Sequence, residues 1–245
     1  MDFSNKLSIQ ELDKIRESFV ANVSHELRTP LTVLRGYLEE LIELKDLSPD
    51  HWPDSADWQF WGKAFDRMGQ QVERMQQLVE DLLLLASIES AALNDDDLEE
   101  IDMNLFLDAM VSDAKSISNN KHEFLINIDS SVKLKGKSHE LNSAFSNLLI
   151  NAVRYTPDGG IIEVKWYQDS IGKHFIVKDS GIGISEKDIS RITERFYRVD
   201  KGRSRNSGGT GLGLSIVKHV LIRHKANLAI ESEIGVGSVF RCDFD

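Results

Sequence analysis

"VSHELRTPLTVLRGYLEEL", residues 23–41, places apolar residues at the three- and four-residue spacing of an α-helix. The pattern extends over residues 8–45 and comprises Ile9, Leu12, Val20, Val23, Leu27, Leu31, Leu34, Leu38 and Leu41. At about 100° per residue, these positions fall within about 60° of the direction opposite His25. We therefore expect His25 to lie on the polar side of a long amphipathic helix.

A second apolar stripe follows residues 47–57, a turn-like segment that contains two prolines. Its members are Phe65, Met68, Val72, Met75, Leu78, Val79, Leu82, Leu83 and Leu85. Two helices joined in a hairpin cannot cover two such stripes by themselves. Because pairing of two hairpins into a four-helix bundle would bury both stripes, the sequence predicts a homodimer.

The overall composition restricts the class of protein. The chain has 245 residues, 41% of them apolar, which suits one large domain or two ordinary ones. Its net charge of −11 opposes nucleic-acid binding, so we expect no nucleic-acid partner. Cys242 is the only cysteine, which excludes an internal disulfide and a cysteine metal cluster. No apolar run is long enough to span a bilayer, so we expect a soluble cytosolic piece.

The acidic segment "LNDDDLEEI", residues 93–101, is the expected linker between a hairpin domain at 1–92 and a second domain at 102–245. In the second domain, helical patterns occupy about 104–117, 138–155 and 212–224. Strand patterns occupy 122–129, 161–168, 174–180, 227–233 and 237–244. This alternation predicts an α+β sandwich with helices on one face of a mixed sheet.

Two segments of the second domain place polar groups where a ligand could bind. Asn147, Asn151 and Arg154 share one face of the helix at 138–155, although such a face can also be ordinary solvated surface. "DSGIGI", residues 179–184, directly follows a strand. Its glycines let the backbone approach a ligand and Asp179 offers an acceptor for an amino group, although the segment can also be a tight turn.

The glycine-rich run "GGTGLGLS", residues 208–215, opens a helix whose N-terminal amides can hold phosphate oxygens. A dinucleotide-binding fingerprint would follow a strand, whereas this run follows the polar, cationic segment "RVDKGRSRNS". The basic residues there suit a nucleoside triphosphate as well as they suit a nucleic acid.

Five segments, in this order, resemble the H, N, G1, F and G2 boxes of bacterial sensor histidine kinases. They are "FVANVSHELRTPLT", "NLLINAVRYTP", "DSGIGI", "RITERFYRVD" and "GGTGLGLSIVK". The flanking "TPLTVLRGYLEE" and "ITERFYRVDKGRSR" are most similar to phosphate-regulon members of that family. The resemblance covers almost the whole chain and implies a dimerisation and phosphotransfer hairpin (HisKA type), followed by a GHKL-type α/β sandwich that binds ATP. It also implies the cytoplasmic portion of an inner-membrane sensor, attached to the membrane only through segments absent from this chain.

Carried over by position, the resemblance implies that His25 is the phospho-acceptor and Glu26 its acid–base partner. It also implies that Asn151 binds Mg²⁺, that Asp179 accepts from the adenine amino group, and that Phe196 anchors a mobile lid. The other residues implied to contact ATP are Asn147, Arg154, Tyr155, Gly181, Gly183, Ile184, Arg198, Lys201, Gly209, Thr210, Gly211, Leu212, Gly213 and Leu214. Arg154 replaces a lysine common in the family, and Ser180 replaces an asparagine; neither change alters the charge pattern.

The implied activity is ATP-dependent autophosphorylation on His25, followed by transfer to an aspartate of a PhoB-like response regulator. Thr29 follows His25 by one helical turn, so its hydroxyl could hold a water that hydrolyses the regulator's phosphate. Pro30 lacks an N–H and leaves the carbonyl of Glu26 without a helical partner, so the helix can bend there. Two alternatives are a non-catalytic nucleotide-binding scaffold (a pseudokinase) and an ATPase that shares the nucleotide fold.

Overall fold

The computed structural model describes residues 9–46, 55–90, 93–199 and 210–245. The chain divides into two compact units, Met1–Glu80 and Asp81–Asp245. The boundary falls inside helix α2 (Ser55–Ser90), so residues 81–90 of this helix belong to the second unit. No helix among the described ranges is long and apolar enough to cross a membrane.

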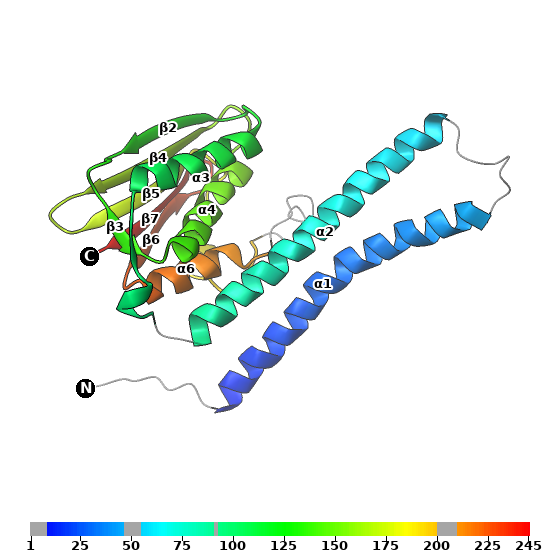
Figure 1. Ribbon diagram of the computed structural model, residues 1–245, viewed down its shortest axis with the longest axis horizontal. Helices are drawn as coiled ribbons and strands as arrows, with labels where there is room; N and C mark the ends of the chain where they lie inside the picture. The colour runs from blue at the N-terminus through cyan, green and yellow to red at the C-terminus, as the bar shows by residue number, and fades with distance from the viewer. Residues whose placement is uncertain (1–8, 47–54, 91–92, 200–209) are drawn as a thin grey trace. The chain divides into compact units, whose positions relative to one another are not determined.

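The first unit is a hairpin of α1 (Ile9–Asp46) and the larger part of α2 (Figure 1). Arg74 Nη2 on α2 lies 3.0 Å from Glu26 Oε2 on α1, and Arg67 Nη1 donates to Tyr37 Oη at 3.3 Å. Residue numbers rise along one helix as they fall along the other, so the two helices are antiparallel. The predicted hairpin is therefore confirmed.

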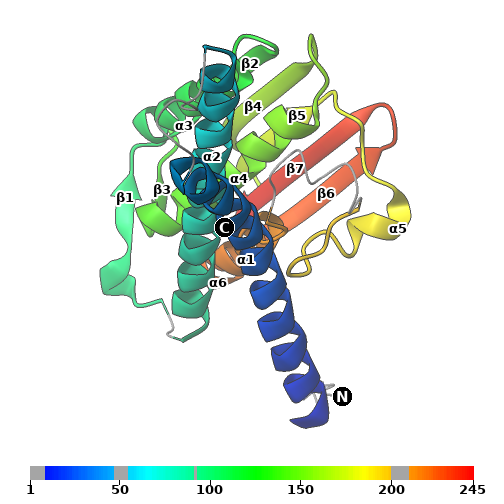
Figure 2. The same cartoon turned by 90° about the vertical axis from the view of Figure 1, so that its right-hand side faces the viewer.

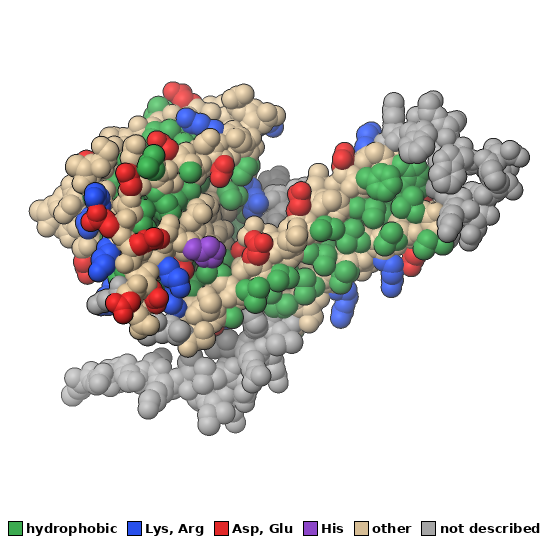
Figure 3. All heavy atoms as spheres, in the orientation of Figure 1, with side chains coloured by type: hydrophobic (Ala, Val, Ile, Leu, Met, Phe, Trp, Pro, Cys, Tyr) green, Lys and Arg blue, Asp and Glu red, His purple; other side chains and the backbone are tan. Residues whose placement is uncertain are grey.

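The hairpin leaves large apolar side chains exposed along both helices (Figure 3). Those in the described part of this unit are Leu31, Val33, Leu38, Ile42, Phe65, Val72 and Val79. Contiguous apolar surface of this kind is characteristic of an interaction face.

The second unit contains a five-stranded mixed sheet of order β2-β4-β5-β7-β6. The strands are β2 (Glu123–Ile128), β4 (Ile161–Gln168), β5 (Lys173–Asp179), β6 (Asn227–Glu233) and β7 (Gly237–Phe244). β2 is parallel to β4, and every other neighbouring pair is antiparallel. Helices α3 (Met103–Ser118), α4 (Ser138–Tyr155) and α6 (Gly213–Arg223) cover one face of this sheet (Figure 2). The predicted sandwich is confirmed.

Local sequence explains the position of these elements. Asp102 caps α3 by accepting from the amides of Asn104 and Leu105, and Asn119 ends the helix in the left-handed region at φ 49°. Alternate residues of β4 point to the helices and are fully buried, including Trp166. Phe145 of α4 stacks on Phe175 of β5 with ring centroids 4.0 Å apart. These contacts form one continuous core.

The described part of the second unit also contains three short elements: a 3-10 turn at Asp95–Asp97, a two-stranded sheet and helix α5 (Glu186–Ile189). In the small sheet, β1 (Glu99–Ile101) pairs antiparallel with β3 (Leu134–Gly136). The segment 93–101, predicted to be a linker, thus includes a paired strand. That this segment separates a phosphotransfer domain from an ATP-binding domain stays a proposal.

Candidate functional site

Asp179 ends β5 and is only 6% exposed. Its Oδ1 accepts a hydrogen bond from the amide of Gly181 at 2.8 Å. Burial raises the pKa of this carboxyl group, while hydrogen bonds from the amides of Gly181 and Ser238 act in the opposite direction. A carboxylate fixed in this way at the end of a strand can accept from the amino group of a ligand.

The glycine loop after Asp179 packs against two other segments. The amide of Ile182 donates to the carbonyl oxygen of Tyr155 at 3.1 Å, and a Cβ on Gly181 would lie 2.6 Å from the same oxygen. Gly183 has φ +69°, and a Cβ there would lie 2.0 Å from the carbonyl oxygen of Glu233. The loop therefore requires glycine at both positions and lies between the end of α4 and the turn after β6.

The polar face of α4 meets the N-terminus of α6. Asn147 and Asn151 are half-buried and Arg154 is exposed. Asn147 Nδ2 donates to the carbonyl of Ser143 at 2.9 Å, and a Cβ on Gly213 would lie 2.2 Å from Asn147 Oδ1. The absence of a side chain at Gly213 thus lets the first turn of α6 approach α4 closely.

The turn before α6 is bonded to the segment that contains Phe196. The amide of Phe196 donates to the carbonyl of Gly211 at 2.9 Å. Gly211 has φ +76°, and a Cβ there would lie 2.9 Å from Phe196 Cα. Thr210 Oγ1 accepts from the amide of Leu212 at 3.2 Å, and Leu212 is fully buried. The first amides of α6 are thereby held in place, as an anion-binding helix N-terminus requires.

Asp188 of α5 is the centre of a polar cluster that holds the chain leading to Phe196. Asp188 accepts hydrogen bonds from the hydroxyls of Ser185 and Tyr197, the latter at 2.7 Å. These two bonds lower the pKa of the Asp188 carboxyl group. The guanidinium of Arg191 lies 4.2 Å from the centre of the Tyr197 ring. Sequence reasoning missed Asp188, although the Ser-x-x-Asp pattern at 185–188 is a sequence signal for the start of a helix. In the structure the hydroxyl of Ser185 bonds the Asp188 carboxylate and makes no capping bond to the backbone.

The described part of the hairpin presents His25 as an exposed side chain on α1. Thr29 Oγ1, one turn later, donates to the backbone carbonyl of His25 at 3.2 Å. The carboxylate of Glu26 is paired with Arg74 of α2. An imidazole that faces solvent, with a hydroxyl and a carboxylate nearby, is an accessible nucleophile.

Two family models match the chain, one over the two helices of the hairpin including the end of α2, and one within the second unit. Residues 15–91 match the His Kinase A (phospho-acceptor) domain. Residues 136–245 match the family of histidine kinase-, DNA gyrase B- and HSP90-like ATPases. The chain belongs to the sensor histidine kinases.

Curated relatives of this histidine kinase include phosphate-regulon sensors. The Phosphate regulon sensor protein PhoR of Pseudomonas aeruginosa is 48% identical over 238 residues, covering 96% of this chain and 51% of that protein. PhoR of Haemophilus influenzae is 38% identical, covering 92% of this chain and 50% of that protein. The chain thus spans about half the length of these relatives. The resemblance to phosphate-regulon members is confirmed at the level of sequence.

A solved structure supports the fold of the histidine kinase. The histidine kinase AdeS of Acinetobacter baumannii has a TM-score of 0.68 and 23% identity, covering 90% of this chain and 97% of that chain. At this identity the likeness establishes the shared fold.

The structure brings most of the predicted ATP-contacting residues into one region of the second unit. Asp179 bonds the amide of Gly181, which lies against the end of α4, and Gly183 lies against Glu233 at the end of β6. Gly211 and Gly213 lie against Phe196 and Asn147. The predicted residues Lys201 and Gly209 lie outside the described residues. The other predicted contacts, around these segments, are Asn151, Arg154, Tyr155, Ile184, Arg198, Thr210, Leu212 and Leu214. The role of each residue stays a prediction.

Proposed function

We propose that this histidine kinase region transfers the γ-phosphoryl group of ATP to His25. The observation that carries the proposal is the set of glycine contacts in the second unit, where a buried carboxylate and the N-terminus of α6 flank the polar face of α4. Side chains at Gly181, Gly211 or Gly213 would collide with Tyr155, Phe196 or Asn147. A backbone-lined site of this kind suits a nucleoside triphosphate.

The side chains around this site also fit a magnesium ion that is bound mainly by phosphate and water and by few protein ligands. The described residues contain no group of three or more His, Cys, Asp or Glu side chains that could hold a metal. Mg²⁺ commonly keeps several waters and takes one or two protein ligands. Asn151, half-buried on the polar face of α4, would supply one amide oxygen. The ion would neutralise phosphate charge during transfer.

In the proposed reaction, a neutral ring nitrogen of His25 attacks the γ-phosphorus. The N–P bond forms, the bond to the bridging oxygen breaks, and ADP leaves. Glu26, the adjacent carboxylate, accepts the proton released from the ring. Glu26 Oε2 lies 3.0 Å from Arg74 Nη2 of α2, which holds the carboxylate beside His25. Arg74 is therefore the residue that positions this base.

The proposed acceptor of the phosphoryl group is an aspartate in the receiver domain of a PhoB-like response regulator, in line with the PhoR relatives. Thr29, Thr32 and Gly36 are exposed and share the side of α1 that carries His25. A docking regulator would contact these positions. We further propose that the same surface dephosphorylates the regulator, with Thr29 orienting the water.

The exposed apolar side chains of the hairpin support a homodimer as the functional form. A second copy of the hairpin would cover them in a four-helix bundle. Since the curated relatives are about twice as long as this chain, we also propose that the region is the cytoplasmic portion of an inner-membrane sensor.

Incubation with γ-labelled ATP and Mg²⁺ tests the proposal. We expect a label that is stable in alkali and labile in acid, as a phosphohistidine is, and we expect His25→Ala to abolish it while nucleotide binding persists. Nucleotide binding without any labelling would instead indicate the non-catalytic scaffold. Release of labelled phosphate without protein labelling would indicate an ATPase, and retained labelling in His25→Ala would exclude His25 as the acceptor.

A further inference from the structure

The end of α2, residues 81–90, belongs to the compact unit that carries the proposed nucleotide site. We call these residues the α2 tail. Among the described residues of the second unit, the side chains of Thr210, Arg195 and Arg223 bind it. Thr210 and Arg195 lie in the G2 and F boxes, so the tail reaches the segments expected to contact ATP.

The first contact joins Asp81 to the turn that precedes α6. Thr210 Oγ1 donates to Asp81 Oδ2 at 3.2 Å and accepts from the amide of Leu212. Asp81 is 5% exposed, so this carboxylate is buried beside the proposed phosphate-binding turn. A negative charge in that place has the same sign as the phosphates expected there.

The second contact joins Glu89 to the F box. The carboxylate of Glu89 pairs with Arg195, and the Nε2 of His219 lies 3.9 Å from the same oxygen. Arg195 directly precedes Phe196, whose amide is bonded to the carbonyl of Gly211. Glu89 therefore contacts the F box, and Asp81 contacts the turn before α6. These two segments are joined by the hydrogen bond between the Phe196 amide and the Gly211 carbonyl.

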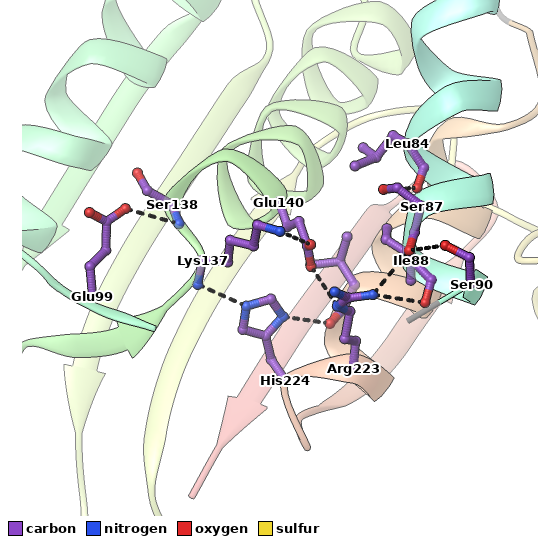
Figure 4. A network of polar contacts seen from close by, with 11 residues as sticks. Leu84, Ser87, Ile88, Ser90, Glu99, Lys137, Ser138, Glu140, Arg223 and His224 are labelled. Carbon is purple, nitrogen blue, oxygen red and sulfur yellow. Dashed lines mark hydrogen bonds and ion pairs between the residues drawn. The ribbon is translucent and has the colours of Figure 1, made fainter. Parts of the chain in front are cut away.

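The third contact fixes the tail without involving the nucleotide site. Arg223 Nη1 donates to the carbonyls of Ser87 and Ile88, at 3.3 and 2.9 Å, in the last turns of α2 (Figure 4). Its Nε lies 3.2 Å from the buried Glu140 Oε2 of α4. Arg223 ends α6, at the opposite end of that helix from Gly213. This contact anchors the tail through carbonyl groups at a helix C-terminus, which attract cations.

We propose that the α2 tail is an internal antagonist of nucleotide binding, in which the buried carboxylate of Asp81 opposes a triphosphate at the turn before α6. Two groups of negative charge near one turn repel each other, and burial strengthens the repulsion. Because coupling between two binding events is reciprocal, nucleotide binding weakens the docking of the tail as much as the docked tail weakens nucleotide binding. The inference rests on the proposed function, because it requires ATP to bind at this turn.

The direct test compares Mg²⁺-bound, non-hydrolysable ATP analogue binding by the full chain and by Asp81→Asn, using calorimetry. We expect the variant to bind about 5-fold more tightly, because it keeps the hydrogen-bond acceptor and loses the charge. Glu80→Gln is the matched control: it removes an exposed carboxylate one residue earlier in the same helix and should leave affinity unchanged. Unchanged or weaker binding by Asp81→Asn, or an equal gain in Glu80→Gln, would overturn the inference.

A second measurement uses the unmodified chain and does not depend on the folding of a variant. Amide hydrogen exchange in residues 82–90 should become faster when the nucleotide analogue is added, because the tail loosens. Slower or unchanged exchange would overturn the inference while leaving the proposed nucleotide site intact. A wild-type chain that binds no nucleotide would overturn both, so the two failures are distinguishable.

Discussion

The hairpin and the sandwich differ in how completely they bury their apolar side chains. In the hairpin, Leu38, Ile42 and Phe65 are 49%, 59% and 51% exposed. In the sandwich, Phe145, Trp166 and Phe175 are fully buried. A single copy of the chain therefore completes the core of the sandwich, whereas in the hairpin it leaves apolar side chains exposed, which the proposed second copy would cover. The difference teaches that the amphipathic pattern of a helix predicts which face needs cover without specifying what covers it.

The largest expected effect comes from the sandwich core. Phe175→Ala removes a fully buried ring that stacks on Phe145, and it should lower the free energy of unfolding by about 3–5 kcal/mol. Denaturant unfolding followed by a probe in the second unit measures this. Phe65→Ala, at a half-exposed aromatic of the hairpin, is the matched substitution and should leave that transition unchanged within about 0.5 kcal/mol. Equal losses would contradict the proposed contrast.

The next effect concerns the hairpin surface. Val72→Glu places a charge on the exposed apolar face and should weaken dimerisation by about 100-fold, since an unpaired charge buried in an interface costs several kcal/mol. Sedimentation over a concentration series measures the dissociation constant.

Gln70→Glu, at an exposed polar position two residues earlier, is the control for added charge and should dimerise normally. A dimer that tolerates Val72→Glu would show that the uncovered face is not the dimer interface.

A smaller effect should separate two activities of the hairpin. Thr29→Ala should leave autophosphorylation within about 2-fold while prolonging the lifetime of the phosphorylated regulator about 10-fold in the presence of ADP, because the hydroxyl that orients water is lost. Time courses with purified phosphorylated regulator measure the lifetime.

Ser116→Ala on α3 is the matched control and should leave the lifetime unchanged, because its exposed hydroxyl bonds the carbonyl of Ser112 four residues earlier, as that of Thr29 bonds the carbonyl of His25. A wild-type lifetime in Thr29→Ala, or a parallel fall in both activities, would remove the proposed role.

The smallest effect is a pH dependence confined to the sandwich. His174 Nδ1 lies 2.6 Å from Asp243 Oδ1, and its Nε2 lies 3.1 Å from Asp169 Oδ1. Burial lowers the pKa of His174, but the two carboxylates together outweigh it, so the pKa is raised overall. The Tyr167 ring and Arg241, itself bonded to Asp243, are the other ionisable groups beside this cluster.

The folded state favours the protonated ring of His174. Its contribution to the free energy of unfolding is therefore complete below about pH 6.5, and it is lost as the pH rises through the raised pKa of His174 in the folded protein. We expect wild type to lose about 1 kcal/mol of stability relative to His174→Gln over that rise. Denaturant unfolding at pH 5.5 to 9 measures the difference. Parallel pH profiles would show that the ring is not charged in the folded protein.

Periodicity and turn chemistry predicted most of the fold. The helix at 138–155 and the strands at 161–168, 227–233 and 237–244 have the predicted bounds. The strands β1 and β3 were missed because each has three residues, too few for a periodic signal, and they pair across a long separation. Short strands of this kind are defined by tertiary contacts.

The glycines of the candidate site were predictable because close backbone approach leaves a local sequence signature. The contact between Asp81 and Thr210 joins residues 129 apart in the sequence, and nothing near Asp81 distinguishes it from the other polar residues of an amphipathic helix. The ion pair between Glu89 and Arg195 likewise joins residues that are distant in the sequence and carry no local signal of the contact. Such pairings depend on which helix face meets which loop, information that one sequence pattern does not contain.

The position of the unit boundary within α2 affects how this kinase could be recombined with others. A chimera joined in the segment 93–101 would bring a foreign α2 end to Thr210, Arg195 and Arg223, whereas a junction at residue 80 would transfer the end of the helix together with its binding partners. The exchangeable module would thus begin within a helix, and the helical phase at the junction would have to be preserved for the grafted residues to reach their partners.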